Sequence, residues 1–301
     1  MMGSITVKQF SQILLGAVGG IFVFSFHQGQ VAVSLPFVEL KMENMVVPVE
    51  INSSEDVIEE PALPPLGKPD SFLPRKPFPP PGLTKPEKPY YSLVPERYQG
   101  KTIDRVSPRN QEKVIALTFD DGPWLETLKV LAVLEQFDIK ATFFILGRNL
   151  LLYPEIIQKV VQSGHAVGNH TWSHPYEKME PLKAKSEVEN TSAKLQLMTG
   201  LKTRLFRPPG GILDNGTAEY ARSKNYAIIM WSIDTKDYQQ APAEILANRV
   251  LTQARPGDIV LMHDGGGNRF QTIESLKIMI PELQKQRYRF VTVPELLTLS
   301  E

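Results

Sequence analysis

Residues 114–123 read VIALTFDDGP, an apolar β-branched run that ends in two carboxylates and a Gly-Pro turn. Val114–Thr118 predicts a buried strand, and Leu125–Phe137 predicts a helix directly after it. The same alternation of a short apolar run with a longer helical pattern continues to the end of the chain. This order indicates a parallel sheet, because each helix returns the chain to start the next strand in the same direction.

Six further strand–helix pairs are predicted after this stretch. The expected strands are 141–146, 166–169, 205–206, 227–231, 258–262 and 289–292. The expected helices are 154–163, 183–199, 215–224, 242–254, 273–286 and 294–299.

Polar side chains follow five of these strands where each strand ends. They are Asp120-Asp121, His170, Arg207, Asp234 with Asp237, and His263. A closed sheet brings all its carboxyl ends to one face, whereas an open doubly wound sheet spreads them along a line. A site that uses all five therefore favours an α/β fold of the (β/α) barrel type. With about seven strands, we expect that barrel to be distorted, either complete or incomplete, with the site at the C-terminal ends of parallel strands.

Composition excludes several classes of protein. The 301 residues carry 33 basic and 33 acidic side chains, so no surface that tracks nucleic-acid phosphates is expected. Cysteine is absent, which excludes disulfides, thiolate zinc sites, Fe–S clusters and a cysteine nucleophile. A transition-metal site must therefore use His, Asp or Glu, and the chain has only five His. Nothing in the sequence indicates an oligomer, and we expect a monomer.

The N-terminal third has a different character. Residues 1–35 contain the apolar run 13–26, which predicts either a cleaved signal peptide or an uncleaved membrane anchor. Residues 61–95 hold 12 prolines in 35 positions, which disfavours both helix and central strand. We therefore expect a largely disordered, Pro-rich linker over 36–112 and one folded domain over 113–301. A chain with this start is expected to be exported to the cell envelope, anchored or secreted.

Two segments carry the residue types of a metal site. Asp120 and Asp121 are adjacent at a strand end, where alternation points them in different directions, so that one can bind metal while the other handles a proton. The alternative is a simple Asp-Gly turn. His170 and His174 are four residues apart, a spacing that places two imidazoles on one side of a helical turn. Two His and one carboxylate suit zinc by default, and cobalt, iron or manganese as well.

Three further segments carry charged or aromatic groups. Arg207 precedes Pro-Pro-Gly-Gly, and beside an Asp it would keep that Asp ionised. Asp234, Asp237 and Tyr238 follow a buried strand. Trp231 is expected in the core, and the alternative is that Trp231 and Tyr238 face a sugar ring. His263 ends a hydrophobic strand before three glycines.

Together, in this order, these five segments resemble the polysaccharide deacetylase domain of carbohydrate esterase family 4, the NodB homology domain, over Lys113–Thr298. The resemblance implies a distorted (β/α) barrel with one divalent metal ion, most often Zn²⁺, with Co²⁺, Mn²⁺, Fe²⁺ or Ni²⁺ as alternatives. It also implies removal of acetyl groups from N-acetylglucosamine polymers such as peptidoglycan or chitin. An acetylated polysaccharide is thus the expected partner.

The resemblance also implies a role for each matching residue. The implied metal ligands are Asp121, His170 and His174. The implied catalytic residues are Asp120 as general base, Arg207 holding that base, His263 as general acid, and Asp237 tuning the acid. The expected substrate-binding residues are Gly210, Tyr238, Leu261 and Trp172. Two positions depart from the family pattern, which has an aromatic where Gly210 stands and Trp where Tyr238 stands.

Three functions stay open from sequence. The first is metal-dependent N-deacetylation of a glycan, in which Asp120 activates water and His263 protonates the amine. The second is O-deacetylation of a polymer such as acetylxylan, which follows the same tetrahedral path. The third is a non-catalytic glycan-binding envelope domain.

Overall fold

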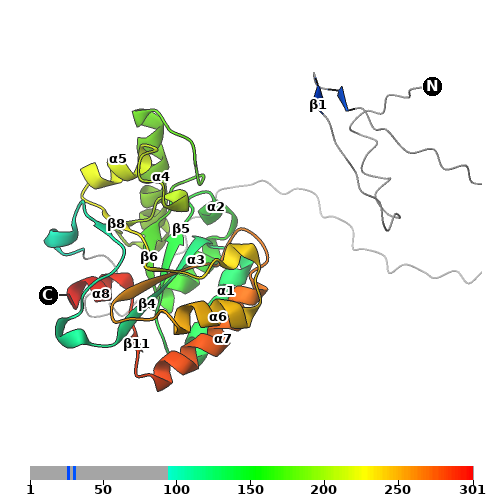
Figure 1. Ribbon diagram of the computed structural model, residues 1–301. Helices are drawn as coiled ribbons and strands as arrows, with labels where there is room; N and C mark the ends of the chain where they lie inside the picture. Colours follow the sequence, from blue (N-terminus) through cyan, green and yellow to red (C-terminus); the bar gives the residue numbers. More distant parts are fainter. Residues whose placement is uncertain (1–25, 28–29, 32–93, 301) are drawn as a thin grey trace, which may run out of the picture. The chain divides into compact units, whose positions relative to one another are not determined.

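The computed structural model describes residues 26–27, 30–31 and 94–300 (Figure 1). The chain divides into two units, Met1–Lys76 and Pro77–Glu301. In the first, β1 (Phe26–His27) pairs antiparallel with β2 (Gln30–Val31). The rest of the predicted signal segment and the Pro-rich stretch lie outside the described residues. Within the described ranges, no helix has the length and apolar character needed to cross a membrane.

The second unit contains a parallel sheet of nine strands. The strands are β3 (Thr102–Ile103), β4 (Val114–Gly122), β5 (Thr142–Ile145), β6 (Ala166–Asn169), β7 (Leu205–Phe206), β8 (Ala227–Ile229), β9 (Ile233–Asp234), β10 (Asp258–His263) and β11 (Arg289–Phe290). Their order is β3-β8-β7-β6-β5-β4-β10-β9, and β11 pairs with the first residues of β4. The strands form a curled half-barrel, which confirms the predicted distorted, incomplete barrel.

Eight α-helices connect or flank these strands in residues 94–300. They are α1 (Leu125–Gln136), α2 (Asn149–Leu152), α3 (Pro154–Gln162), α4 (Pro181–Thr199), α5 (Thr217–Ser223), α6 (Ala243–Leu251), α7 (Phe270–Lys285) and α8 (Val293–Thr298). Helix α6 packs on α7, and α4 packs on α5 (Figure 1).

The folded region begins before the predicted boundary at Lys113. Thr102–Ile103 forms β3, which pairs with β8 at one end of the sheet. Ile103 and Val106 are buried in the same cluster as strands β7 and β8. Residues 94–112 therefore belong to the folded domain and not to the linker, and β3 was not among the predicted strands.

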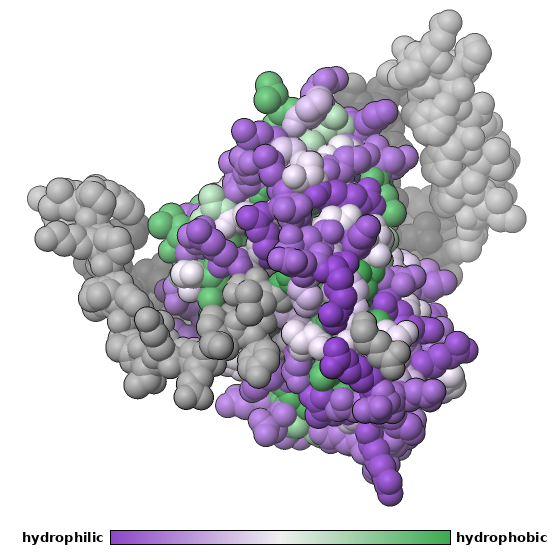
Figure 2. All heavy atoms as spheres, turned by 90° about the vertical axis from the view of Figure 1, so that its left-hand side faces the viewer, coloured by the Kyte–Doolittle hydropathy of each residue, from purple (hydrophilic) through white to green (hydrophobic). Residues whose placement is uncertain are grey.

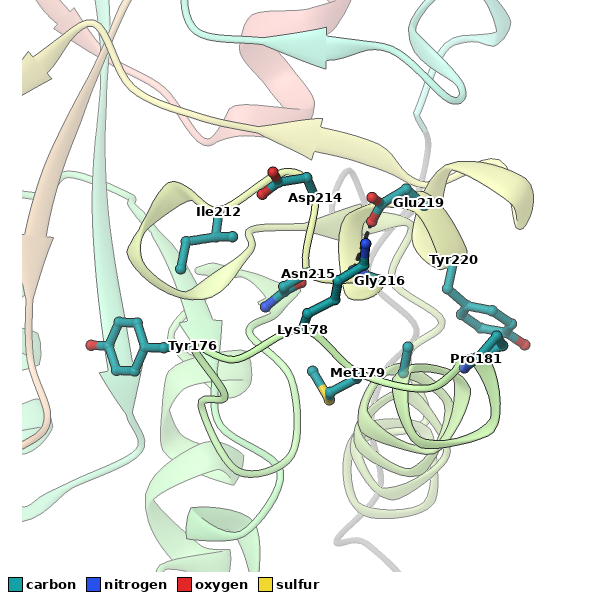
Figure 3. Close-up of a pocket in the computed structure, with 11 residues that line it drawn as sticks. Tyr176, Lys178, Met179, Pro181, Ile212, Asp214, Asn215, Gly216, Glu219 and Tyr220 are labelled. Carbon is teal, nitrogen blue, oxygen red and sulfur yellow. Dashed lines mark hydrogen bonds between the residues drawn. The ribbon is translucent and has the colours of Figure 1, made fainter.

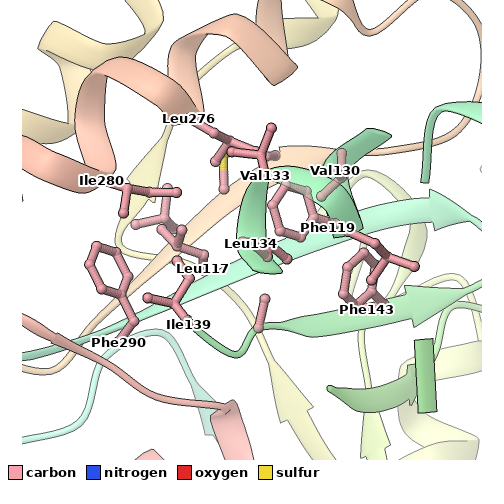
Figure 4. Packing of buried hydrophobic residues seen from close by; sticks show 14 of the residues in the cluster. Leu117, Phe119, Val130, Val133, Leu134, Ile139, Phe143, Leu276, Ile280 and Phe290 are labelled. Atoms are coloured by element: carbon pink, nitrogen blue, oxygen red, sulfur yellow. The ribbon is translucent and has the colours of Figure 1, made fainter. Parts of the chain in front are cut away.

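The two faces of β4 explain how the core positions a site. Ile115, Leu117 and Phe119 point to one side, where they pack against α1 and α7 (Figure 4). Val114 and Ala116 point to the other side, into a smaller cluster that includes residues of α8. Alternation continues this second face into Thr118 and Asp120. The interior of the half-barrel is thus apolar at one end and polar at the carboxyl end of the strands.

One face of the surface is mostly hydrophilic. On the face seen in Figure 2, hydrophilic residues cover most of the coloured surface, and hydrophobic residues form small separate spots.

Candidate active site

Carboxyl ends of five strands supply the polar residues expected from the sequence. His263 of β10 lies beside Asp120 of β4 in the sheet register. A cavity of about 400 Å³ opens above them. Its lining residues are Asp120, Asp121, His170, His174, Tyr176, Gly210, Trp231, Asp234, Tyr238, Leu261, His263 and Arg269. The structure therefore brings the separate motifs to one site.

Asp120 and Asp121 both face this cavity, which differs from the alternation expected of a strand. The β4–β5 register shifts between Asp120 and Gly122, and Asp121 has a φ of 74°. Simple alternation would turn the Asp121 side chain away from the cavity. The bulge changes the direction of the backbone at Asp121, so its side chain faces the cavity as well. Asn149 of α2 fixes the bulge by donating to the Asp121 carbonyl at 2.7 Å. The positive φ is favoured only by residues such as Asp, Asn and Gly.

His170 and His174 lie on a loop and not on the helical turn that their spacing suggested. Thr171 and His174 have positive φ values of 69° and 63°. The loop is held by the buried carboxylate of Glu187 on α4, which accepts hydrogen bonds from Trp172 N, Ser173 N and Ser173 Oγ at 2.7–2.8 Å. The two imidazoles still meet, with ring centroids 5.0 Å apart.

The site has three side chains with atoms that can coordinate a cation: Asp121, His170 and His174. His170 Nδ1 lies 2.7 Å from the Arg207 carbonyl, to which it must donate, so Nε2 keeps its lone pair. That Nε2 is 3.6 Å from Asp121 Oδ1, and His174 Nε2 is 3.4 Å from the same oxygen. Asp121 Oδ1 is buried and has no hydrogen-bond partner in the described structure. Ligand atoms of all three residues lie within 4.8 Å of one another, so the set can hold one metal ion.

Burial keeps the His170 ring neutral, as a metal ligand must be. The ring is 2% exposed, and burial lowers its pKa to about 3 against the smaller, opposite effect of Asp121. A neutral imidazole is the form that binds metal. The hydrogen bond to a backbone carbonyl also fixes which nitrogen faces the cavity.

Asp120 is paired with Arg207, as expected. Arg207 is fully buried, and its Nη1 donates to Asp120 Oδ1 and to Thr118 Oγ1, each at 2.8 Å. Burial raises the pKa of the Asp120 carboxyl more than Arg207 and His263 lower it. Arg207 does lower the pKa of Asp120, as expected from the sequence, but burial has the larger effect. The pKa of Asp120 therefore lies above its usual value. A raised pKa makes the carboxylate a stronger base.

His263, which lies beside Asp120 in the sheet register, forms a second pair with Asp237. His263 Nδ1 is 2.7 Å from Asp237 Oδ1, and Asp237 Oδ2 accepts from His263 N and Thr272 Oγ1, both at 2.8 Å. Burial lowers the pKa of His263, but the hydrogen bond and charge of Asp237 outweigh it and raise the pKa to about 9. His263 is therefore protonated at neutral pH, with Nε2 left to donate.

The residues expected to bind substrate divide into two groups. Gly210, Tyr238 and Leu261 line the cavity, Tyr238 being 49% exposed and edge-on to His263. Trp172 does not line it, because its ring packs over Gly147, where an added Cβ would lie 2.4 Å from Trp172 Cε3. Trp231, expected in the core, is half-buried and does line the cavity.

Sequence reasoning missed three residues of this neighbourhood. Tyr176 and Arg269 line the cavity, and Glu187 holds the histidine loop. Tyr176 follows the second histidine by two residues, so its closeness to the motif was a signal. Glu187 looked like an ordinary helix residue, and no spacing rule links it to residues 172–173.

The comparisons with known proteins agree with this geometry. Residues 107–229 match the polysaccharide deacetylase family profile. Two peptidoglycan-N-acetylglucosamine deacetylases of Bacillus cereus are similar to the chain. One is 41% identical over 199 residues, covering 62% of this chain and 90% of the relative. The other is 35% identical over 232 residues, covering 70% and 84%.

Solved structures show the same similarity. The Bc1960 peptidoglycan N-acetylglucosamine deacetylase superposes with a TM-score of 0.63 at 33% identity, covering 68% of this chain and 95% of that one. BA3943 of Bacillus anthracis, described as a pseudoenzyme of carbohydrate esterase family 4, gives 0.60 at 30% identity, covering 66% and 69%. The fold and the geometry of the motifs agree with these similarities, which extend over most of the length of the relatives. This chain belongs to the polysaccharide deacetylases of carbohydrate esterase family 4.

Proposed function

We propose that this protein is a metal-dependent hydrolase that removes N-acetyl groups from a polysaccharide containing N-acetylglucosamine, with peptidoglycan as the preferred substrate. One observation carries the proposal. Ligand atoms of Asp121, His170 and His174 meet in one cavity. Asp120, paired with Arg207, and His263, paired with Asp237, line the same cavity. The names of the bacterial relatives support peptidoglycan as the polymer.

Asp121, His170 and His174 would hold one divalent ion, for which zinc is our first choice because two imidazoles and one carboxylate suit it. Such an ion supplies Lewis acidity, which polarises a carbonyl and acidifies water. The donor set does not separate zinc from Co²⁺, Mn²⁺, Fe²⁺ or Ni²⁺, so the metal is to be identified by analysis of the purified protein.

Asp120 is the proposed general base. It lies at the cavity floor, its Oδ1 is held by Arg207, and its Oδ2 is 3.7 Å from His170 Nε2. In this position it accepts the proton of the water that attacks the acetyl carbonyl carbon. The proposed oxyanion donor is the backbone N–H of Gly210, and one such donor contributes about 3–4 kcal/mol in known cases.

His263 is the proposed general acid. An amide nitrogen leaves only when it is protonated, so the group that donates must carry a proton at working pH. The Asp237 carboxylate meets this need by raising the pKa of His263 to about 9. Leu261 and the ring of Tyr238 would border the acetyl group and the sugar, respectively. Hydrolysis of an O-acetyl ester would use the same residues and has a better leaving group. Tests with different substrates therefore distinguish an esterase from an N-deacetylase.

The test uses the full chain loaded with Zn²⁺ and incubated separately with peptidoglycan strands, chitin oligomers and acetylxylan. We expect mass spectrometry to show loss of acetyl from amino sugars, and Asp120→Asn to stop turnover while metal stays bound. Acetate release from acetylxylan alone would establish the esterase instead. Metal binding without turnover on any glycan would support a non-catalytic domain, for which the related pseudoenzyme is a precedent.

We also propose that the protein acts outside the cytoplasm, as a monomer in the cell envelope. The support is the apolar run within residues 1–35, which predicts an export signal or an anchor, together with relatives named for peptidoglycan. Fractionation of cells that produce the tagged full chain, followed by N-terminal sequencing, distinguishes cleavage from anchoring.

A further inference from the structure

A second cavity adjoins the candidate active site. It has a volume of about 630 Å³ and lies between the loop that follows His174 and the loop before α5 (Figure 3). Tyr176 and Tyr220 stand at opposite ends of it in Figure 3. Tyr176 also lines the candidate active site and a third cavity beside α2. Among the cavities found in the described part of the chain, no other residue borders all three of these.

Tyr176 is placed to contact a ligand that spans two cavities. Its side chain is 59% exposed, although its ring packs edge-on against His174, with centroids 4.9 Å apart. An exposed aromatic ring held beside a metal-ligand candidate presents an apolar face to the solvent side of the site. Aromatic rings of this kind bind the apolar faces of sugar rings, while the hydroxyl group remains available for hydrogen bonds.

Gly210 makes this position of Tyr176 possible. A Cβ added at Gly210 would lie 3.0 Å from Tyr176 Cε1, closer than ordinary contacts allow. Gly210 also has a φ of 59°, which a residue with a side chain rarely adopts. The space that a side chain at position 210 would occupy is thus taken by the ring of Tyr176, which comes from another loop.

The second cavity has the mixed lining that a sugar needs. Met179, Pro181 and Ile212 provide apolar surface, and Lys178 and Asp214 provide charge. No hydrogen bond joins the side chains of Lys178 or Asp214 to another described residue, whereas the Glu219 carboxylate accepts from Gly216 N. Uncommitted polar groups around an apolar floor match the alternating hydroxyls and C–H faces of a pyranose.

We propose that the second cavity is a subsite for the sugar next to the one being deacetylated, and that Tyr176 is the aromatic wall shared by the two sugars. This inference rests on the proposed function, since it takes the ligand to be the same polysaccharide. Under this proposal, Tyr176, Lys178 and Asp214 recognise the length of the glycan chain and take no part in the hydrolysis itself.

The experiment compares N-acetylglucosamine dimer and tetramer as probes. Binding is measured by calorimetry on the zinc-loaded full chain carrying Asp120→Asn, and turnover is measured without that substitution. Tyr176→Ala should weaken tetramer binding and raise its KM by roughly three- to tenfold, with kcat little changed, and Tyr176→Phe should restore most of the loss. Lys178→Ala and Asp214→Ala should each reduce the preference for tetramer over dimer. Leu182→Ala, at an 81% exposed position outside the cavity lining, is the matched control.

A double-mutant cycle tests the role of Gly210. Gly210→Ala strains the backbone equally in both backgrounds, but it displaces the ring only when Tyr176 is present. Its effect on tetramer binding should therefore be smaller in the Tyr176→Ala background than in the parent. Equal effects in both backgrounds contradict the steric link.

The outcomes separate this inference from the proposed function. If the unsubstituted chain releases acetate but Tyr176→Ala and Asp214→Ala behave like Leu182→Ala, the deacetylase stands and the subsite is wrong. If the protein prefers tetramer to dimer only when a peptide stem is attached, the cavity binds peptide and the sugar assignment is overturned. If no glycan is deacetylated yet tetramer binding still depends on Tyr176, the function fails and the subsite stands.

Discussion

His170 and His263 occupy the same rim of the half-barrel, yet the structure sets them to opposite charge states. Burial lowers the pKa of His170 to about 3, while Asp237 raises that of His263 to about 9. The difference comes from the partner of Nδ1, a neutral backbone carbonyl for His170 and a carboxylate for His263. In the proposed mechanism, the neutral ring binds the metal and the protonated ring donates the proton. The partner of one nitrogen thus decides the role of the whole residue.

Replacing each histidine by alanine gives the largest test of this comparison. His170→Ala should lose both metal and activity, because it removes one of three ligands. His263→Ala should keep the metal and lower kcat by about 10²- to 10⁴-fold, the usual effect of losing a general acid. Metal content by elemental analysis and acetate release are measured on the same samples. Equal metal loss in both variants would contradict the division of roles.

Asp237→Asn tests how the charge of His263 is set. As the proposed general acid, His263 would act while protonated, so wild-type kcat/KM should fall as the pH rises through about 9. Without the Asp237 charge, burial lowers the pKa of His263 against only the smaller, opposite effects of Asp120 and Asp121. The basic limb of the pH profile should therefore move to lower pH. Thr272→Val is the matched control, because it removes a hydrogen bond to Asp237 and leaves its charge in place. A basic limb that stays in place in Asp237→Asn would show that another group controls it.

Glu187→Gln gives the smallest expected effect, on the metal side alone. The Glu187 carboxylate holds the loop that carries both histidine ligands, and an amide accepts fewer of its three hydrogen bonds. Changes to such supporting residues lower metal affinity by about 10–100-fold. Competition with a fluorescent chelator measures the affinity. The basic limb of the pH profile, which depends on His263, should not move in Glu187→Gln. A shift of that limb would mean that the histidine loop and the His263–Asp237 pair are coupled.

Local patterns predicted most of the secondary structure. The strand at Ala166–Asn169 and the helix that starts at Pro154 are found where the sequence placed them, because periodicity and an N-terminal proline act over a few residues. The short strands β3 and β9 were missed. Each has two residues and forms only because a neighbouring strand offers its hydrogen-bonding edge.

Local patterns also failed where the backbone leaves regular geometry. The bulge at Asp121 and the loop at His170–His174 both use positive φ values, which no spacing rule reveals. Trp172 lies within the histidine motif in the sequence, and in the structure its ring packs on Gly147. Closeness in sequence therefore identified the motif without giving the direction of each side chain.

The sequence alone determined the class of fold and the residue types available for chemistry, because composition and periodicity are properties of the chain itself. Only the tertiary structure decided the charge of each group and the direction of each side chain. Those depend on burial and on partners far away in the chain, such as Arg207 beside Asp120, Asp237 beside His263 and Glu187 under the histidine loop. Electrostatic and hydrogen-bond energies act through space, and the fold sets the distances over which they act.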